Sequence, residues 1–115
     1  MRKILAAAAV SVLAFAGIGE AAQHRGTMLA SWYGGYFHGR TTANGERYDM
    51  YGLTAAHKTL PFGTKLRVCY QGCTTVRIND RGPFIGAREL DLSYGAAKAV
   101  GLLHPGVANV EVTYL

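Results

Sequence analysis

The chemistry open to this chain depends on a few carboxylates and one histidine. The segment VRINDRGPF, residues 76–84, alternates apolar and polar residues as a half-buried strand does, and a Gly-Pro pair ends it. At a spacing of two residues, Asp80 falls on the same face as Val76 and Ile78, so we expect it to face the core. Such a carboxylate is either a turn residue that accepts backbone hydrogen bonds or a functional acid.

Other ionisable residues stand in short polar blocks. Glu46 and Asp49 lie in TTANGERYD. His57 ends LTAAH, and Asp91 follows a short extended run. The sequence has no Gly-x-Ser-x-Gly segment, no phosphate-binding glycine loop before a helix, and no histidines closely spaced for a metal. This elimination leaves acid–base chemistry by carboxylates.

Aromatic residues gather near these blocks, among them Trp32, Tyr33 and Tyr48. Exposed aromatic rings beside carboxylates suit a sugar-binding groove, where flat apolar faces stack. Trp32 and Tyr33 are also compatible with a role in the core of a small barrel, because tryptophan is usually highly buried.

The first 22 residues have the pattern of a secretory signal peptide. Met1 to Lys3 is basic, Ile4 to Ile18 is apolar and rich in alanine, and small residues follow. The apolar run is shorter than the roughly 20 residues that span a bilayer. We therefore expect cleavage after Ala21 or Ala22 rather than a retained membrane anchor, and a periplasmic or secreted protein.

Residues 23–115 are expected to form one small domain, which buries about 60–65% of its unfolded surface. Cys69 and Cys73 are the only cysteines, and they flank a short segment that is typical of a hairpin turn. Export permits oxidation, so we expect a disulfide across this turn. Two free thiols or half of a metal site are the alternatives, and the lack of a second cysteine pair argues against zinc.

The balance of charge is basic. Removal of Arg2, Lys3 and Glu20 would leave ten basic and six acidic residues, a net charge of +4. A basic exported domain suits a polyanionic partner such as cell wall or an anionic membrane, although a solvated basic surface has the same composition. There is no Lys/Arg run or nucleic-acid module, so nucleic acid is not expected as a partner. We expect a monomer that needs no metal or cofactor.

Short strands with glycine-rich turns and one helix predict a mainly β domain, as a barrel or a sandwich. Ser93 can cap a helix over residues 94–100, which Gly101 would end. Strands are expected at Met28–Tyr33, Leu53–Ala56, Thr64–Tyr70, Thr74–Asn79, Ala87–Leu92 and Val107–Leu115, with a loose lead-in over Gln23–Thr27 and a long loop over Gly34–Asn44.

The polar blocks follow one another in an informative order. ASWYG at residues 30–34 is followed by FHGRTTANGERYDM, LTAAHKTLPFGT, VRINDRGPF and ELDLS. This order resembles the rare lipoprotein A family over about residues 30–115. The resemblance implies a six-stranded double-psi β-barrel, the fold of expansins and of a membrane-bound lytic transglycosylase family. It also implies endolytic cleavage of peptidoglycan glycan strands, preferably those stripped of stem peptides.

The resemblance extends to individual residues. It implies that Asp80 has a functional role rather than only a turn role, and that Asp91 matches the acid of related double-psi barrels. The catalytic positions are expected to be Glu46, His57, Asp80 and Asp91, and the substrate-binding positions Asp49, Trp32, Tyr33, Tyr48 and Arg81.

The implied reaction breaks the β-1,4 bond between N-acetylmuramic acid and N-acetylglucosamine and closes a 1,6-anhydro ring with the muramoyl 6-hydroxyl. One carboxylic acid can suffice, first as acid and then as base, because the internal hydroxyl has a high effective molarity. Such an acid needs a pKa raised by burial or by a like charge. Asp80 and Asp91 both qualify, and an Arg81 side chain folded onto Asp80 would favour Asp91.

Two features of the family are missing from the sequence. Many members carry a lipid-attachment cysteine at the signal cut and a C-terminal peptidoglycan-binding repeat domain, and neither is present here. Membrane attachment and septal targeting are therefore left open. The competing functions are an expansin-like module that binds and loosens wall glycan without cleaving it, and a secreted inhibitor or effector with an inactive site.

Overall fold

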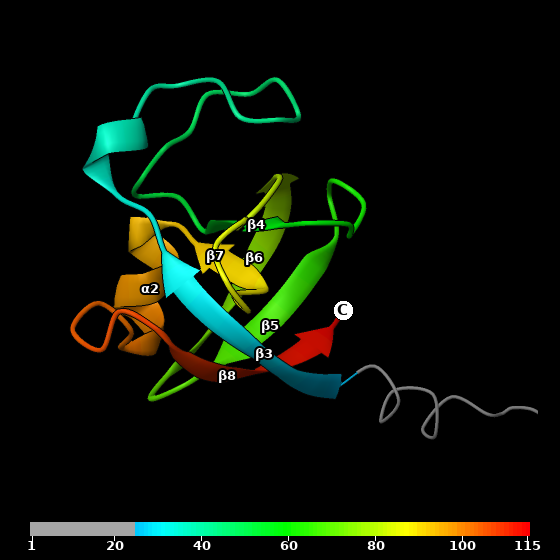
Figure 1. The fold of residues 1–115 in the computed structure, drawn as a ribbon, viewed down its shortest axis with the longest axis vertical. Helices are drawn as coiled ribbons and strands as arrows, with labels where there is room; N and C mark the ends of the chain where they lie inside the picture. Colours follow the sequence, from blue (N-terminus) through cyan, green and yellow to red (C-terminus); the bar gives the residue numbers. More distant parts are fainter. Residues whose placement is uncertain (1–24) are drawn as a thin grey trace, which may run out of the picture.

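A closed barrel of six strands carries one α-helix in the computed structural model, which describes residues 25–115 (Figure 1). The expected signal peptide, residues 1–22, lies outside the described residues. The strands are β3 (Arg25–Trp32), β4 (Thr54–His57), β5 (Lys65–Cys69), β6 (Cys73–Asp80), β7 (Leu90–Leu92) and β8 (Ala108–Tyr114), with the 3-10 helix η2 (Gly35–Phe37) and the α-helix α2 (Tyr94–Val100).

The strands follow one another around the barrel in the order β3-β7-β4-β6-β5-β8. The pairs β3–β7 and β4–β6 are parallel, and the remaining pairs are antiparallel. The segment from η2 to β4 arches over one end of the barrel (Figure 1). This segment forms part of the candidate site described below.

Alternate residues of the strands fill the barrel. In β5, Leu66 and Val68 are fully buried, while Lys65 and Arg67 on the other face are exposed. This alternation is the normal pattern of an antiparallel strand with one solvated face. The core consists of Ala30, Ala55, Leu66, Val68, Val76, Ile78, Leu90, Leu92, Ala96, Ala97, Val100, Leu102, Val110 and Val112.

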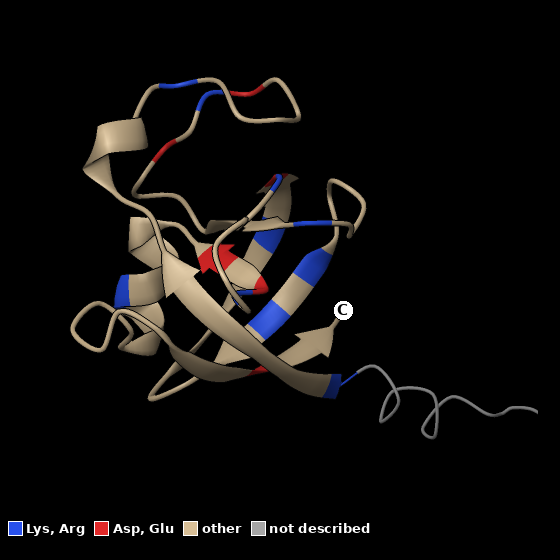
Figure 2. Cartoon of the chain, in the orientation of Figure 1, with Lys and Arg blue, Asp and Glu red and all other residues tan. Residues whose placement is uncertain are grey.

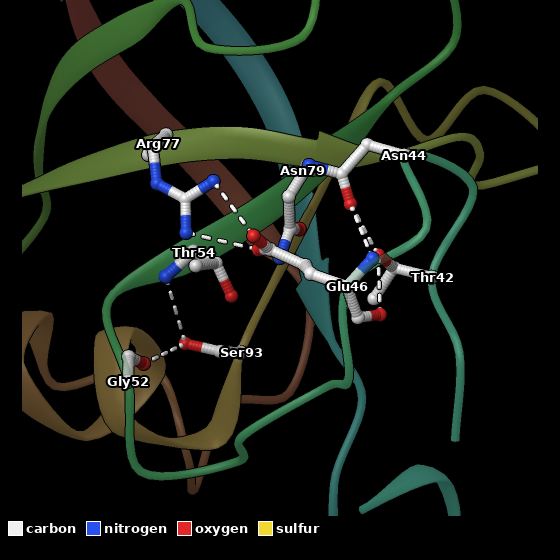
Figure 3. Close-up of polar contacts among 8 residues, drawn as sticks. All are labelled: Thr42, Asn44, Glu46, Gly52, Thr54, Arg77, Asn79 and Ser93. Carbon is white, nitrogen blue, oxygen red and sulfur yellow. Dashed lines mark hydrogen bonds and ion pairs between the residues drawn. The ribbon is translucent and has the colours of Figure 1, made fainter. Parts of the chain in front are cut away.

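The helix has the expected limits. The Ser93 hydroxyl accepts a hydrogen bond from the Ala96 amide at 3.1 Å, and Gly101 ends the helix in a left-handed conformation with φ 83°. Ser93 also donates to the Gly52 carbonyl at 2.7 Å (Figure 3). The start of the helix is thus joined to the loop that precedes β4.

The first residues of β3 and β7 differ from the sequence prediction by three residues, and the other strand ends differ by one at most. The expected loose lead-in is wrong for residues 25–27, because they pair with residues 111–113 of β8 and extend β3. Strand β7 is restricted to Leu90–Leu92, the part that pairs with both β3 and β4.

The predicted disulfide is confirmed. Cys69 and Cys73 are directly paired in the β5–β6 hairpin, with their Cα atoms 4.1 Å apart and a bond between their sulfur atoms. No helix within residues 25–115 combines the length and the apolar character that a membrane span requires.

Strand β6 does not continue its alternation to the last residue. The pairing with β4 shifts after Ala55–Ile78, so that Ala56 pairs with Asp80 and Asn79 is an extra residue. The expectation that Asp80 faces the core with Val76 and Ile78 is therefore wrong. The irregularity turns the Asp80 side chain toward an open cleft instead.

Candidate functional site

Two carboxylates lie in one row across the sheet. Ser31 of β3 pairs with Asp91 of β7, Asp91 pairs with Ala56 of β4, and Ala56 pairs with Asp80 of β6. We call these four residues the carboxylate row. Neighbouring strands are about 4.8 Å apart, so the Cα atoms of Asp80 and Asp91 are separated by about 10 Å. Only the methyl group of Ala56 stands between the two acids along the row.

Three residues of the carboxylate row, Ala56, Asp80 and Asp91, line a cleft of about 310 Å³. One wall comes from the loop after β3, and the other from the segment that follows β6. Figure 2 shows that the loop between β3 and β4 carries both basic and acidic residues. The lining residues are Tyr33, Phe37, Arg40, Thr41, Thr42, Tyr48, Ala56, Asp80, Arg81, Gly82, Pro83, Phe84, Ile85 and Asp91.

Asp91 has the environment of a proton donor. Burial raises the pKa of its carboxyl, and the nearby Asp80 charge adds a smaller upward shift. The Ser31 hydroxyl donates a hydrogen bond to Asp91 Oδ1 at 2.9 Å, and this contact and Arg88 oppose the shift without reversing it. The burial follows from the position of Asp91 in the short strand β7, between β3 and β4.

Asp80 holds the loop that forms one cleft wall. Its Oδ1 atom accepts hydrogen bonds from the amides of Ala43 and Arg81, both at 2.9 Å. The first bond fixes the tip of the loop, and the second fixes the start of the opposite segment. Gly82 follows with φ 116°, a conformation that favours glycine, and a side chain there would contact the ring of Phe84. Asp80 therefore carries both the turn role and a place in the cleft.

Tyr33 and Tyr48 line one side of the cleft with rings that are tilted by 32° and have their centroids 4.7 Å apart. The Tyr48 hydroxyl donates to the Tyr33 carbonyl at 2.9 Å and accepts from the Tyr94 amide at 3.2 Å. Tyr48 is thus a structural support. The Tyr33 hydroxyl is buried and has no hydrogen-bond partner within the described part of the chain, and burial strongly raises its pKa. The Tyr33 hydroxyl therefore stays protonated near neutral pH.

The guanidinium of Arg81 turns away from Asp80. It donates to the carbonyls of His57 and Leu60, at 3.1 and 2.8 Å, and lies 3.9 Å from the centre of the Phe62 ring. The contact between Arg81 and Asp80 is made by the backbone amide alone. Arg81 lines the cleft, but its charged end stabilises the turn after β4.

His57 is the last residue of β4, directly before the same turn, and does not line the cleft. Its Nδ1 atom accepts hydrogen bonds from the amides of Thr59 and Leu60, both at 3.1 Å. Burial lowers its pKa, so the imidazole is neutral near neutral pH. The structure therefore places His57 where it orders the turn that holds Arg81.

Glu46 is engaged in an ion pair rather than exposed to the cleft (Figure 3). Its two carboxylate oxygens accept hydrogen bonds from the two terminal nitrogens of Arg77, at 3.2 and 2.9 Å. Asn79 Nδ2 donates a further, short hydrogen bond. The hydrogen bonds from Arg77, and then that from Asn79, lower the pKa of Glu46, which is the wrong direction for a proton donor at neutral pH.

Asp49 and Trp32 also lie outside the cleft. Asp49 accepts a hydrogen bond from the Tyr51 amide and borders a separate shallow hollow with Glu46. Trp32 packs against the core, and its indole nitrogen donates to the Leu103 carbonyl at 3.3 Å. The core role that the sequence left open for Trp32 is thus found, and its assignment to substrate binding stays a prediction.

The structure thus brings together five of the nine expected site residues: Asp80, Asp91, Tyr33, Tyr48 and Arg81. Sequence reasoning missed Ser31, Ala56 and Arg40. Ser31 and Ala56 stand in the quoted blocks ASWYG and LTAAH, but only the strand register shows that they flank Asp91. Within residues 25–115, no three His, Cys, Asp or Glu residues cluster as a metal site would require.

Residues 25–112 match a family model described as lytic transglycolase. The chain belongs to this family. Curated relatives include the probable endolytic peptidoglycan transglycosylase RlpA of Synechocystis, 59% identical over 87 residues, and the endolytic peptidoglycan transglycosylase RlpA of Pseudomonas aeruginosa (strain PAO1), 51% identical over 96 residues. These matches cover 73% and 81% of this chain but 27% and 28% of the relatives, so the chain spans little more than a quarter of their length.

Solved structures bear out the fold. A Streptomyces papain inhibitor superposes with a TM-score of 0.63 at 22% identity, covering 79% of this chain and 94% of that one. A Clavibacter michiganensis expansin in complex with cellohexaose superposes with a TM-score of 0.65 at 18% identity. The match covers 79% of this chain and 50% of the expansin. These neighbours are double-psi β-barrel proteins, which confirms the predicted fold class.

Proposed function

We propose that this protein is an endolytic lytic transglycosylase that cleaves the β-1,4 bond between N-acetylmuramic acid and N-acetylglucosamine in peptidoglycan. The observation that supports this most directly is the carboxylate row: Asp91, with its pKa raised by burial, faces a cleft that Asp80 shares. Membership in the lytic transglycolase family supports the same class of substrate. The expected export would deliver the protein to the cell wall, in the periplasm or outside the cell.

In this mechanism Asp91 is the general acid. Its carboxyl donates a proton to the glycosidic oxygen as the bond from that oxygen to C1 of the muramoyl residue breaks. The muramoyl 6-hydroxyl attacks C1 and closes the 1,6-anhydro ring, and its proton passes to the Asp91 carboxylate. The acid is thereby restored and no water is consumed. An acid whose pKa lies nearer the working pH than that of an ordinary aspartate suits both steps.

Asp80 would act through its charge and its contacts. A carboxylate beside the reacting carbon stabilises the positive charge of an oxocarbenium-like transition state. Its hydrogen bond to the Ala43 amide also keeps the cleft wall in place. The two acids are thus assigned different tasks, one as the proton donor and the other as a fixed negative charge.

The apolar rim of the cleft would hold the sugar rings. Phe84 and Ile85 are exposed to 77% and 63%, unusually open for large apolar side chains, and they line the wall opposite Phe37. Tyr33 adds aromatic surface to the same cleft.

A digest of peptide-stripped peptidoglycan tests the proposal. The protein, the variants Asp91→Asn and Asp80→Asn, and the control Glu111→Gln would be incubated with the strands, and new ends identified by mass spectrometry. Glu111 is exposed on β8, outside the cleft, so its replacement removes a carboxylate without touching the site. We expect anhydro-muramoyl ends from the protein and the control, and none from Asp91→Asn.

Other outcomes would overturn parts of the proposal. Reducing ends would identify a hydrolase. Binding without any new ends would identify an expansin-like binding module. Loss of anhydro ends in Asp80→Asn but not in Asp91→Asn would reverse the assignment of the acid.

A further inference from the structure

Arg40 is a cation in the cleft for which the described residues, 25–115, supply no anionic partner. It lines the wall formed by the loop after η2. Its guanidinium lies 4.5 Å from the centre of the Tyr36 ring, and within residues 25–115 it forms no ion pair. Tyr36 is itself exposed, so this contact leaves the edge of the guanidinium accessible to a ligand.

The other arginine that lines the cleft differs in this respect. The guanidinium of Arg81 is held by the carbonyls of His57 and Leu60 and stacks on Phe62. It stabilises the protein's own turn. Of the two cations in the cleft wall, Arg40 is therefore the one whose charged donors are available.

The backbone of Arg40 is fixed even though its side chain is free. Its amide donates to the Phe37 carbonyl at 2.9 Å, and its carbonyl accepts from the Tyr48 amide at 2.7 Å. The preceding Gly39 is bonded to the Tyr48 carbonyl through its amide and to Arg47 through its carbonyl. Since the loop is already ordered, a ligand that binds Arg40 has only a side chain to immobilise.

A guanidinium presents parallel donors that match the two oxygens of a carboxylate. We propose that Arg40 binds the lactyl carboxylate of the muramoyl residue and so makes this protein sensitive to whether that carboxylate is free. The inference rests on the proposed function. In a strand that carries stem peptides the lactyl group is an amide, which has no charge at this position. In a stripped strand it is an anion, and it is attached to the sugar whose C1 reacts.

The test compares three substrates: stripped strands with free lactyl carboxylates, the same strands converted to the lactyl methylamide, and strands that keep their stem peptides. The values of kcat/KM are measured for the protein, for Arg40→Gln, and for the control Arg67→Gln, which removes an exposed arginine from β5 outside the cleft. The methylamide strands cannot form the charge-assisted contact with Arg40. The native protein and the control should therefore cleave them about tenfold more slowly than the free-acid strands. Arg40→Gln should cleave both at the same reduced rate.

The inference is overturned if Arg40→Gln still cleaves the free-acid strands faster than the methylamide strands. It is equally overturned if the native protein cleaves both kinds of strand at the same rate. A general loss of folding would lower all rates equally and leave the ratio unchanged. The dissociation constants of the same strands, measured with Asp91→Asn and with Asp91→Asn combined with Arg40→Gln, supply a readout that needs no turnover. Absence of anhydro ends from every substrate, with carboxylate-dependent binding retained, would refute the proposed function while leaving the role of Arg40 intact.

Discussion

Replacement of Glu46 distinguishes an anchoring role from a catalytic role at this position. The ion pair with Arg77 joins the loop to β6, and the side chains of Arg77 and Glu46 are 41% and 34% exposed. Ion pairs so open to solvent contribute about 0.2–1 kcal/mol, and the hydrogen bond from Asn79 adds about 1 kcal/mol. The attachment is therefore worth about 1–2 kcal/mol, which is about 5- to 30-fold in an equilibrium. A lost general acid would instead lower the rate about 10²- to 10⁴-fold.

The assay is a cycle of Glu46→Gln, Arg77→Met and the double variant. Each variant is measured by its free energy of unfolding in urea and by kcat/KM on stripped strands. If Glu46 anchors the loop, Glu46→Gln, which weakens both contacts, should lose about 5- to 30-fold in kcat/KM, and Arg77→Met, which removes the ion pair alone, should lose about 5-fold or less. The double variant should lose little more than Glu46→Gln, because the ion pair is already weakened in that variant. The coupling free energy should be about 1 kcal/mol.

The anchoring role would be refuted by an asymmetric result. If Glu46→Gln lost more than about 100-fold in rate while Arg77→Met stayed close to the native protein, the carboxylate would be taking part in the chemistry. Equal stability of all variants would also contradict it, since the ion pair would then contribute nothing to the fold.

The remaining predictions concern the floor of the cleft and the hairpin. Asp91→Asn should abolish cleavage yet raise the melting temperature at neutral pH. Because the pKa of Asp91 is higher in the folded than in the unfolded protein, the stability of the native protein falls as the pH rises through the folded-state pKa, and the variant avoids this loss. Melting curves of both proteins over a series of pH values check this. Ala56→Leu should fill the space between the two acids and prevent strand binding, measured by pull-down, while circular dichroism stays native. Reduction of the Cys69–Cys73 disulfide should lower stability by about 2 kcal/mol, measured in urea, with kcat/KM unchanged.

The sequence predicted the elements well where local chemistry determines them. Ser93 and Gly101 define the helix through capping bonds that involve only nearby residues. The alternation in Leu66–Val68 identifies the buried face of β5, and the cysteine spacing places the hairpin. These features depend on contacts within a few residues, which a pattern can show.

The site was harder to predict because it depends on register between distant strands. Simple alternation places Asp80 in the core, and the shift at Ala55–Ala56 that redirects it has no local signal. The alternation likewise says nothing about which residue lies next to Asp91. Glu46 looked catalytic because it is an acid in a polar loop, and its pairing with Arg77, 31 residues away, becomes visible only when β6 reaches the loop.

The strand order has a consequence for when activity can arise. Within residues 25–115, β5 and β6 are the one pair of barrel neighbours that are also adjacent in sequence. The carboxylate row crosses β3, β7, β4 and β6, so each of its pairings joins strands that are separated along the chain. Closure of such long loops comes late, after local structure has formed. A nascent or partly unfolded copy therefore has no assembled acid pair, and the activity proposed for this protein would begin only once its barrel has closed.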